Sequence, residues 1–120
     1  MVLTLVACVT FKFYQAYQRL EVHFFKENAY HFLERGREEA VARDADVFFE
    51  LNSTALQMRS GSLQIARLQT PKLITLSLTV SKLGFTGKGT ASSSGTLLIQ
   101  SGSEVSKITL SAAQGKITIQ

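Results

Sequence analysis

Cysteine and proline are almost absent from this chain, and each scarcity has a structural consequence. The 120 residues contain one cysteine and one proline. A single cysteine excludes an intramolecular disulfide bond. Cys8 stands in an apolar run, where a small buried or lipid-facing thiol is expected. The proline is Pro71, so no proline interrupts a helix before that position.

Acidic residues are scarce in the second half of the chain. Residues 51–120 carry seven Lys and Arg against one acidic residue, Glu104, a net charge of +6, whereas residues 1–50 carry six against eight, a net charge of −2. Solubility charge on a small β domain is the preferred interpretation of this asymmetry, and a polyanionic neighbour for the second half is the alternative. The candidate DNA contacts are four lysines near the expected loops and strands: Lys82, Lys88, Lys107 and Lys116.

The first part of the chain predicts one long helix. Met1–Phe11 carries no charge, and from there to Arg43 there is no proline and a single glycine, Gly36. Helices of globular proteins typically run about 8–20 residues, so an uninterrupted helical pattern of roughly 40 needs a further explanation. A membrane span needs about 20 apolar residues, and Lys12 ends the apolar run after eleven. We expect the second half of a span, with the reading frame continuing upstream into roughly ten more apolar residues and a short basic leader.

The apolar face of this helix changes direction along its length. At 100° per residue, a front stripe and a back stripe are rotated by roughly 140° from each other. Two stripes indicate two partners, something outside the chain for the front and the chain's own strands for the back; a slightly irregular core helix is the alternative. The expected membrane or assembly residues are Val2, Leu3, Leu5, Val6, Val9, Phe13, Tyr17, Leu20 and Phe24. The expected helix–sheet packing residues are Phe25, Ala29, Phe32, Leu33 and Gly36.

Beyond Arg43 the pattern predicts short strands. A strand begins at Val47, and two apolar segments flank Ser60-Gly61 as in a hairpin. After a turn at Pro71, strict alternation from residue 74 to residue 80 predicts a strand with one buried face. We expect a loop over residues 84–95 and strands over residues 96–100, 105–110 and 116–119. The expected fold class is α+β, with one long N-terminal helix packed on a C-terminal antiparallel β-sheet.

No arrangement of residues supports catalysis. His23, Glu27 and His31 are four apart on one helix, but a zinc protease helix requires the glutamate directly after the first histidine. A solvated or assembly-facing stripe is the preferred interpretation. The segment LGFTGKGT, residues 83–90, lacks the spacing of a phosphate-binding loop and does not lead into a helix. We therefore expect neither an enzyme nor a cofactor.

The order of these elements resembles the type IV pilin and pseudopilin family: an apolar helix start, an amphipathic continuation and a closing run of short antiparallel strands. The closing segment is similar to minor pseudopilins of the FimT and type II secretion H class. In these proteins a turn of the form F…G and a small-residue loop precede two strands and a final G-x-I-x-I element, here residues 115–119. The small size and low aromatic content resemble competence minor pilins of the ComGD type from Gram-positive bacteria.

One departure from the family concerns the start of the chain. The prepilin signature, a glycine followed by F-T-L-x-E, is absent. In the family a prepilin peptidase cuts after that glycine and methylates the new N-terminus. Met1 aligns several residues into the mature helix. A start codon assigned too late or a deliberately shortened chain explains this, and a leaderless protein is the alternative.

The resemblance implies a function and its partners. Residues 1–24 would lie in the cell membrane as a single pass before assembly and in the filament core afterwards, and residues 25–120 would form a globular domain outside the cell. The implied function is that of a minor pilin of a competence-type pilus, which supports DNA uptake in natural transformation. Its partners would be other pilin subunits, the prepilin peptidase and, weakly and non-specifically, DNA. The alternatives are a minor pseudopilin of a type II secretion system, and a surface-anchored basic module that binds DNA or an anionic wall polymer.

Overall fold

A computed structural model of the protein describes the backbone of residues 2–52, 54–80, 82–102, 104–111 and 116–119, and the side chains of these ranges from residue 12 onward. Its main element is a single helix, α1 (Val2–Arg43). A 42-residue helix is about 63 Å long, which accounts for the largest dimension of the molecule, 64 Å. The uninterrupted helix expected from the sequence is confirmed, and it ends at Arg43, close to the change of pattern that predicted its end.

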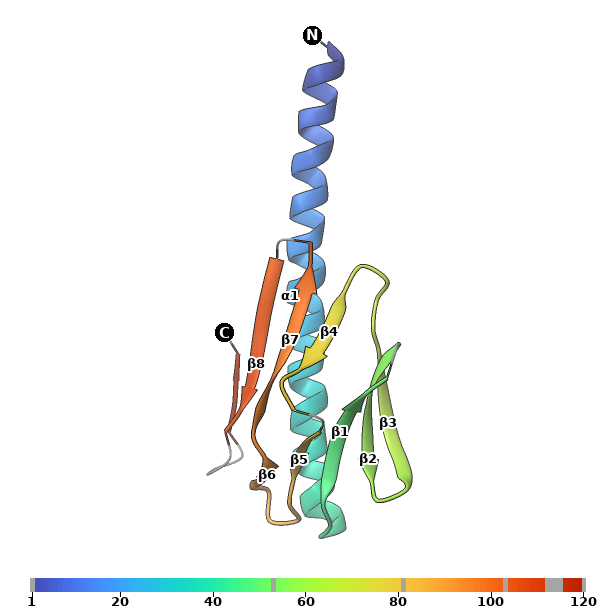
Figure 1. Ribbon diagram of the computed structural model, residues 1–120, viewed down its shortest axis with the longest axis vertical. Helices are drawn as coiled ribbons and strands as arrows, with labels where there is room; N and C mark the ends of the chain where they lie inside the picture. The colour runs from blue at the N-terminus through green and yellow to red at the C-terminus, as the bar shows by residue number, and fades with distance from the viewer. Residues whose placement is uncertain (1, 53, 81, 103, 112–115, 120) are drawn as a thin grey trace.

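In the part of the chain that the structure describes, nine short strands follow the helix and form two antiparallel sheets (Figure 1). The first sheet has the order β3-β2-β1-β5-β6 and the second has the order β4-β7-β8-β9. The strands of the first sheet are β1 (Val47–Leu51), β2 (Ala55–Ser60), β3 (Leu63–Gln69), β5 (Leu83–Phe85) and β6 (Ala91–Ser93). Those of the second are β4 (Thr75–Leu78), β7 (Gly95–Ser101), β8 (Glu104–Leu110) and β9 (Ile117–Ile119). The α+β class is confirmed, and the expected single sheet is divided into two.

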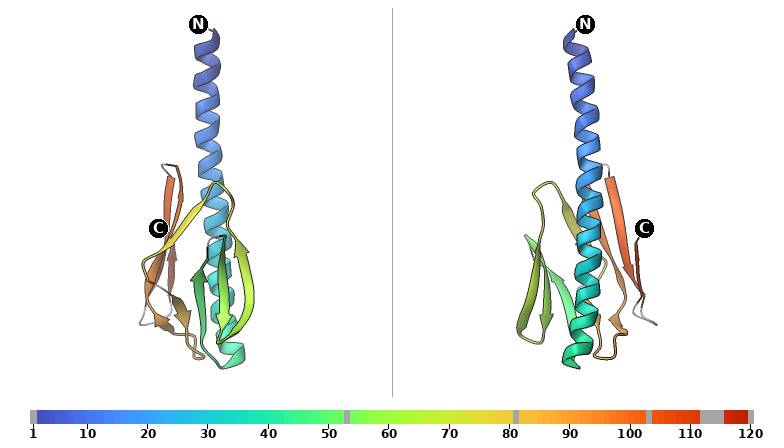
Figure 2. Two further views of the ribbon diagram at one scale, coloured as in Figure 1. Left: turned by 45° about the vertical axis from the view of Figure 1, so that its right-hand side comes forward. Right: turned by 180° about the vertical axis from the view of Figure 1, so that it is seen from behind.

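The helix runs along both sheets, with the first sheet on one side of it and the second on the other (Figure 2). The core lies between the helix and the sheets and has an aromatic centre. The ring of Phe49 on β1 meets Phe32 of α1 edge-on at 5.6 Å and Phe85 of β5 edge-on at 6.2 Å. All three side chains are buried. Edge-to-face pairs of this kind contribute beyond the area that they bury, so the cluster links the helix to the first sheet.

The loop expected over residues 84–95 is a correction to the sequence analysis. Leu83–Phe85 is strand β5, which pairs with β1, and Ala91–Ser93 is strand β6, which pairs with β5. Phe85 is fully buried. Gly84 permits the close approach of the strands, because a Cβ there would lie 3.2 Å from the carbonyl oxygen of Val47 and 2.5 Å from Ser92 Oγ. Three-residue strands next to glycines carry too short an apolar pattern to be distinguished from a loop.

The turns agree with their sequence signals. The β2–β3 hairpin closes at Gly61, which has a φ of 61°, a conformation that glycine adopts without steric cost. The backbone N–H of Ile74 donates to the carbonyl oxygen of Pro71 at 3.1 Å and closes the turn before β4. Between β1 and β2, Asn52 Oδ1 accepts hydrogen bonds from the backbone N–H groups of Thr54 and Ala55 at 2.9 and 2.8 Å.

Candidate assembly surface

Two opposite faces of α1 differ in what covers them. The face toward the sheets is buried: Phe25, Ala29, Phe32, Leu33 and Gly36 all lie in the core. These are the residues that the sequence analysis assigned to helix–sheet packing. Small residues at two of these positions bring the helix close to the strands, since a Cβ at Gly36 would lie 2.9 Å from Cε2 of Phe49. The sheets therefore pack against the back half of the helix.

The buried face extends further toward the N-terminus than the sequence analysis proposed. Gln18 and Val22 are also buried, and they continue the spacing of three and four residues that leads to Phe25. A Cβ added at Gly102, in the β7–β8 turn, would lie 2.6 Å from Nε2 of Gln18. The sheets thus reach the helix at Gln18, and the spacing of these two residues was the signal that could have revealed it.

An ion pair holds the helix to the second sheet at the same level. Arg19 Nε donates to Glu104 Oε1 at 3.1 Å, and Arg19 is largely exposed. Glu104 is the one acidic residue of the second half of the chain. Because exposed pairs of this kind contribute little stability, the contact serves mainly to position the β7–β8 turn beside the helix.

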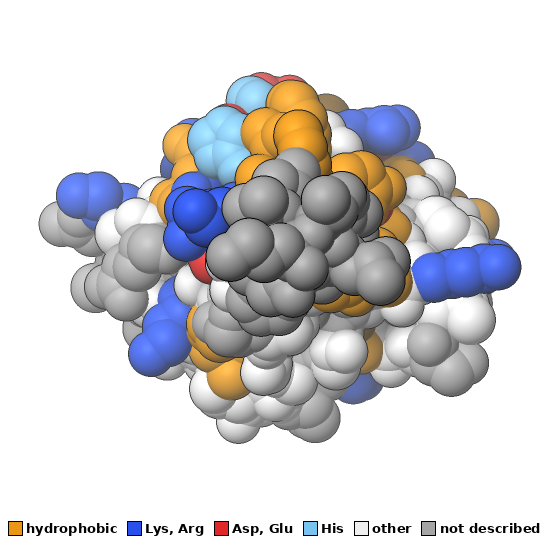
Figure 3. Space-filling view, turned by 90° about the horizontal axis from the view of Figure 1, so that it is seen from above, with side chains coloured by type: hydrophobic (Ala, Val, Ile, Leu, Met, Phe, Trp, Pro, Cys, Tyr) orange, Lys and Arg blue, Asp and Glu red, His pale blue; other side chains and the backbone are white. Residues whose placement is uncertain are grey.

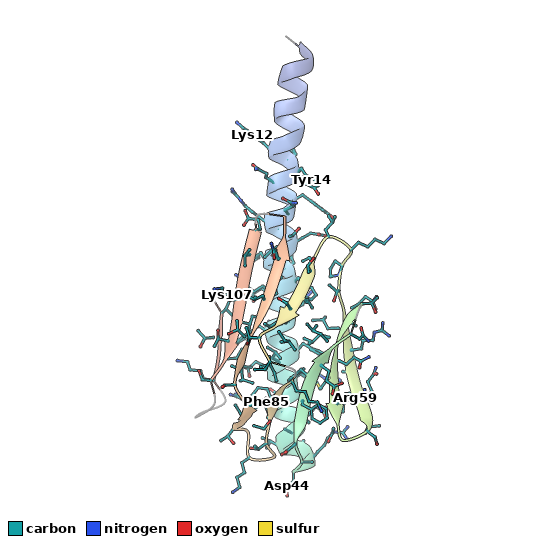
Figure 4. All side chains as sticks on the ribbon, viewed as in Figure 1. Lys12, Tyr14, Asp44, Arg59, Phe85 and Lys107 are labelled. Carbon is teal, nitrogen blue, oxygen red and sulfur yellow. The ribbon has the colours of Figure 1, made fainter. Side chains whose placement is uncertain are left out.

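The opposite face of the front half of α1 is apolar and exposed. Phe13, Tyr17, Leu20 and Phe24 are 69%, 52%, 53% and 62% exposed, and they follow one another at spacings of four, three and four residues. Together with Tyr14 and Ala16, the first three line a shallow apolar hollow. Figure 4 shows Lys12 and Tyr14 on the stretch of helix that stands clear of the sheets. We call Phe13, Tyr17, Leu20 and Phe24 the aromatic stripe.

The aromatic stripe does not continue as an apolar surface along the back of the helix. Counting 100° per residue, His31, Arg35 and Glu38 occupy the same angular range as the stripe, and all three are exposed. Contiguous exposed apolar surface marks a site of interaction with another molecule. The change from aromatic to polar residues therefore confines the interaction surface to the front half.

The other expected helix residues lie outside the described side chains. Val2, Leu3, Leu5, Val6 and Val9 are on α1, and the structure describes their backbone only. Among the residues that the structure describes, no helix combines the length and the apolar character that crossing a membrane requires. In the same part of the chain, no group of three His, Cys, Asp or Glu side chains is placed to hold a metal ion.

The four candidate DNA-contacting lysines do not converge on one patch. Lys82 precedes β5 and pairs with Glu50 at 3.4 Å, with its Nζ 4.5 Å from the ring centroid of Phe48. Lys88 is exposed in the β5–β6 turn. Lys107 is on β8 and Lys116 lies opposite Ser111, just past the end of that strand. These two are about 13 Å apart along the strand direction.

Comparison of the whole fold with solved structures gives clear matches, although no family model and no curated protein sequence matches the chain. The type IV minor pilin FimU of Pseudomonas aeruginosa superposes with a TM-score of 0.71 at 18% identity, over 86% of this chain and 90% of FimU. The minor pseudopilin EpsH of the type 2 secretion system of Vibrio cholerae superposes with a TM-score of 0.68 at 15% identity, over 83% of this chain and 96% of EpsH. At these identities the likeness concerns the fold, and the chain has the α+β fold of the minor pilins and pseudopilins.

Proposed function

We propose that this protein is a minor subunit of a competence-type pilus that supports DNA uptake in natural transformation. The pilin fold supports the structural part of the proposal. The aromatic stripe is the observation that supports assembly into a filament. Its four large apolar side chains are exposed to solvent on the face of α1 opposite the protein's own sheets. In a filament, the helices of neighbouring subunits would bury them. The part of α1 before Gln18, which stands clear of the sheets, would then lie in the membrane before assembly. Residues up to Phe24 would lie in the filament core after assembly, and residues 25–120 would be displayed outside the cell.

Substitution within the aromatic stripe tests assembly. Leu20→Glu places a charge at the centre of the surface that neighbouring helices would bury, and burial of an unpaired carboxylate is strongly unfavourable. Because Leu20 is 53% exposed in the isolated chain, the variant should fold normally and fail to enter filaments. Glu38→Gln is the matched control, since Glu38 is exposed at the same angular position five turns further along α1. Normal amounts of the Leu20→Glu variant in purified filaments would refute the proposal.

A minor pseudopilin of a type II secretion system is the second candidate, and the likeness to EpsH favours it. The two functions differ in what a cell loses with the gene. Deletion in the source organism should lower transformation frequency if the filament takes up DNA. It should instead leave exported enzymes in the periplasm if the filament belongs to a secretion system. Complementation by the Leu20→Glu variant should fail in either case.

We further propose weak, non-specific DNA contact through Lys82, Lys88, Lys107 and Lys116, each as a separate phosphate contact because the four do not form one patch. Each lysine that contacts a phosphate contributes a slope of about −0.9 to the plot of log affinity against log salt. Lys107→Gln should therefore reduce the slope by about one, with equal effect on unrelated sequences. Glu50→Gln should strengthen binding, because Glu50 holds Lys82 at 3.4 Å and competes with phosphate. Fluorescence anisotropy with labelled duplex at low and moderate salt measures both, and an unchanged slope for Lys107→Gln would contradict the assignment of that lysine.

A further inference from the structure

Two connecting segments surround the point at which the helix leaves the sheets. The β3–β4 connection, residues 70–74, and the β7–β8 turn at Gly102 both lie at the end of the sheets nearest the free end of α1 (Figures 1 and 2). The contact between Gly102 and Gln18 sets the β7–β8 turn level with Gln18. The far end of the sheets, with the β2–β3 hairpin, points the other way. The molecule therefore presents one face toward the N-terminus of its own helix.

This face combines exposed apolar side chains with lysine and arginine. Leu73 in the β3–β4 connection is 42% exposed, and Val105 at the start of β8 is 54% exposed. Lys72, next to Leu73, is exposed as well. Figure 3, which looks down on this face, shows Lys and Arg side chains on several sides of the helix end and few acidic ones. The acidic residue of the turn, Glu104, is already paired with Arg19.

The height of this face along the helix matches the thickness of a lipid headgroup layer. Lys12 lies six residues before Gln18, which corresponds to about 9 Å of helix rise. The headgroup region of one leaflet is about 5–8 Å thick, half of the difference between the full bilayer and its hydrocarbon core. With Lys12 at the inner edge of that region, Tyr14 and Tyr17 lie within it, where tyrosine is enriched in membrane proteins. The face formed by the β3–β4 connection and the β7–β8 turn then lies at the outer edge of the headgroup region.

We propose that this face docks on an anionic membrane surface, with Leu73 and Val105 entering the headgroup layer and Lys72 contacting lipid phosphates. The inference rests on the proposed function, in which the front of α1 lies in a bilayer before assembly. Apolar side chains flanked by lysines are the combination by which peripheral segments bind anionic lipid. Docking would hold the globular domain upright on the membrane, with the β2–β3 hairpin directed away from it.

Tryptophan fluorescence of the 120-residue chain tests the docking. The sequence contains no tryptophan, so a single introduced residue reports its own surroundings. Leu73→Trp places the reporter on the proposed face. Leu63→Trp is the matched control, because Leu63 is 54% exposed in the β2–β3 hairpin at the opposite end of the sheets. The chain is mixed with vesicles of one-third phosphatidylglycerol in phosphatidylcholine, with or without lipids that carry a bromine quencher near the headgroup.

With anionic vesicles, the emission of Leu73→Trp should shift to shorter wavelength and be quenched by the brominated lipids, whereas that of Leu63→Trp should not change. Adding Lys72→Gln to Leu73→Trp should raise the anionic-lipid concentration needed for half of the response by about fivefold. Adding Lys88→Gln should leave that concentration unchanged. A chain that sediments with the vesicles but shows equal emission at both positions would overturn the docking and leave the membrane proposal intact. Failure to sediment with vesicles would overturn both. An equal response on pure phosphatidylcholine would overturn the assignment to anionic lipid.

Discussion

Gly36 offers a sharp test of how α1 packs on the first sheet. In an exposed helix, Gly→Ala stabilises by about 1 kcal/mol because alanine loses less conformational entropy. At Gly36 the added methyl group would overlap the ring of Phe49, 2.9 Å from Cε2 and 3.1 Å from Cε1. That ring is fully buried and held edge-on by Phe32 and Phe85. It cannot move aside without disturbing both neighbours.

The gain in helix propensity and the clash with the Phe49 ring oppose each other. Their magnitudes decide whether Gly36→Ala stabilises or destabilises the protein. Overpacking of a well-packed core costs about 1–3 kcal/mol, and the immobile ring places this site in the upper half of that range. Subtracting the helix-propensity gain leaves a net loss of about 1–2 kcal/mol for Gly36→Ala. Urea unfolding followed by circular dichroism measures it as a lower midpoint with an unchanged slope.

Repeating Gly36→Ala in a Phe49→Leu protein separates the steric clash from every other effect of Gly36→Ala. Phe49→Leu removes the ring that the methyl group would meet, so Gly36→Ala added to Phe49→Leu should stabilise by about 1 kcal/mol. The sign of the same substitution therefore reverses between the two backgrounds, which corresponds to a coupling of about 2–3 kcal/mol. A Gly36→Ala protein at least as stable as the unmodified chain in the Phe49 background would refute the packing argument.

Two further predictions concern the β1–β2 turn and the helix surface. Asn52→Ala removes the acceptor of two backbone N–H groups, those of Thr54 and Ala55, and should lower the free energy of unfolding by about 1 kcal/mol; an unchanged urea midpoint would contradict this. The hydrogen bond from Tyr30 to Glu34, with the charge of that carboxylate, raises the pKa of Tyr30. The stabilisation is present below the usual pKa of tyrosine and is lost as pH rises through the folded-state pKa. Glu34→Gln should lower that pKa in an absorbance titration in which the other two tyrosines are phenylalanine, and a titration curve that does not move would contradict the assignment.

Local pattern was sufficient to predict the helix and most strands. The absence of proline before Pro71 and the two apolar stripes predicted a continuous helix, and the change to a β-type pattern after Arg43 predicted its end near that residue. Alternation and turn residues predicted the hairpin at Gly61 and the strands of the second sheet. These features depend on residues within one or two turns or strands of each other, and such residues report which face of an element is buried.

Tertiary structure decided which distant segments meet. Strand β5 exists because it pairs with the distant strand β1, in which Val47, 38 residues earlier, faces Phe85. Glu104 reaches Arg19 across 85 residues, and Gly102 in the β7–β8 turn contacts Gln18. A three-residue strand or a single carboxylate has no periodicity to reveal its partner. The sequence by itself therefore determined the faces of the helix and of the longer strands, whereas the contacts between α1 and the β7–β8 turn depend on the packing of elements far apart in the chain.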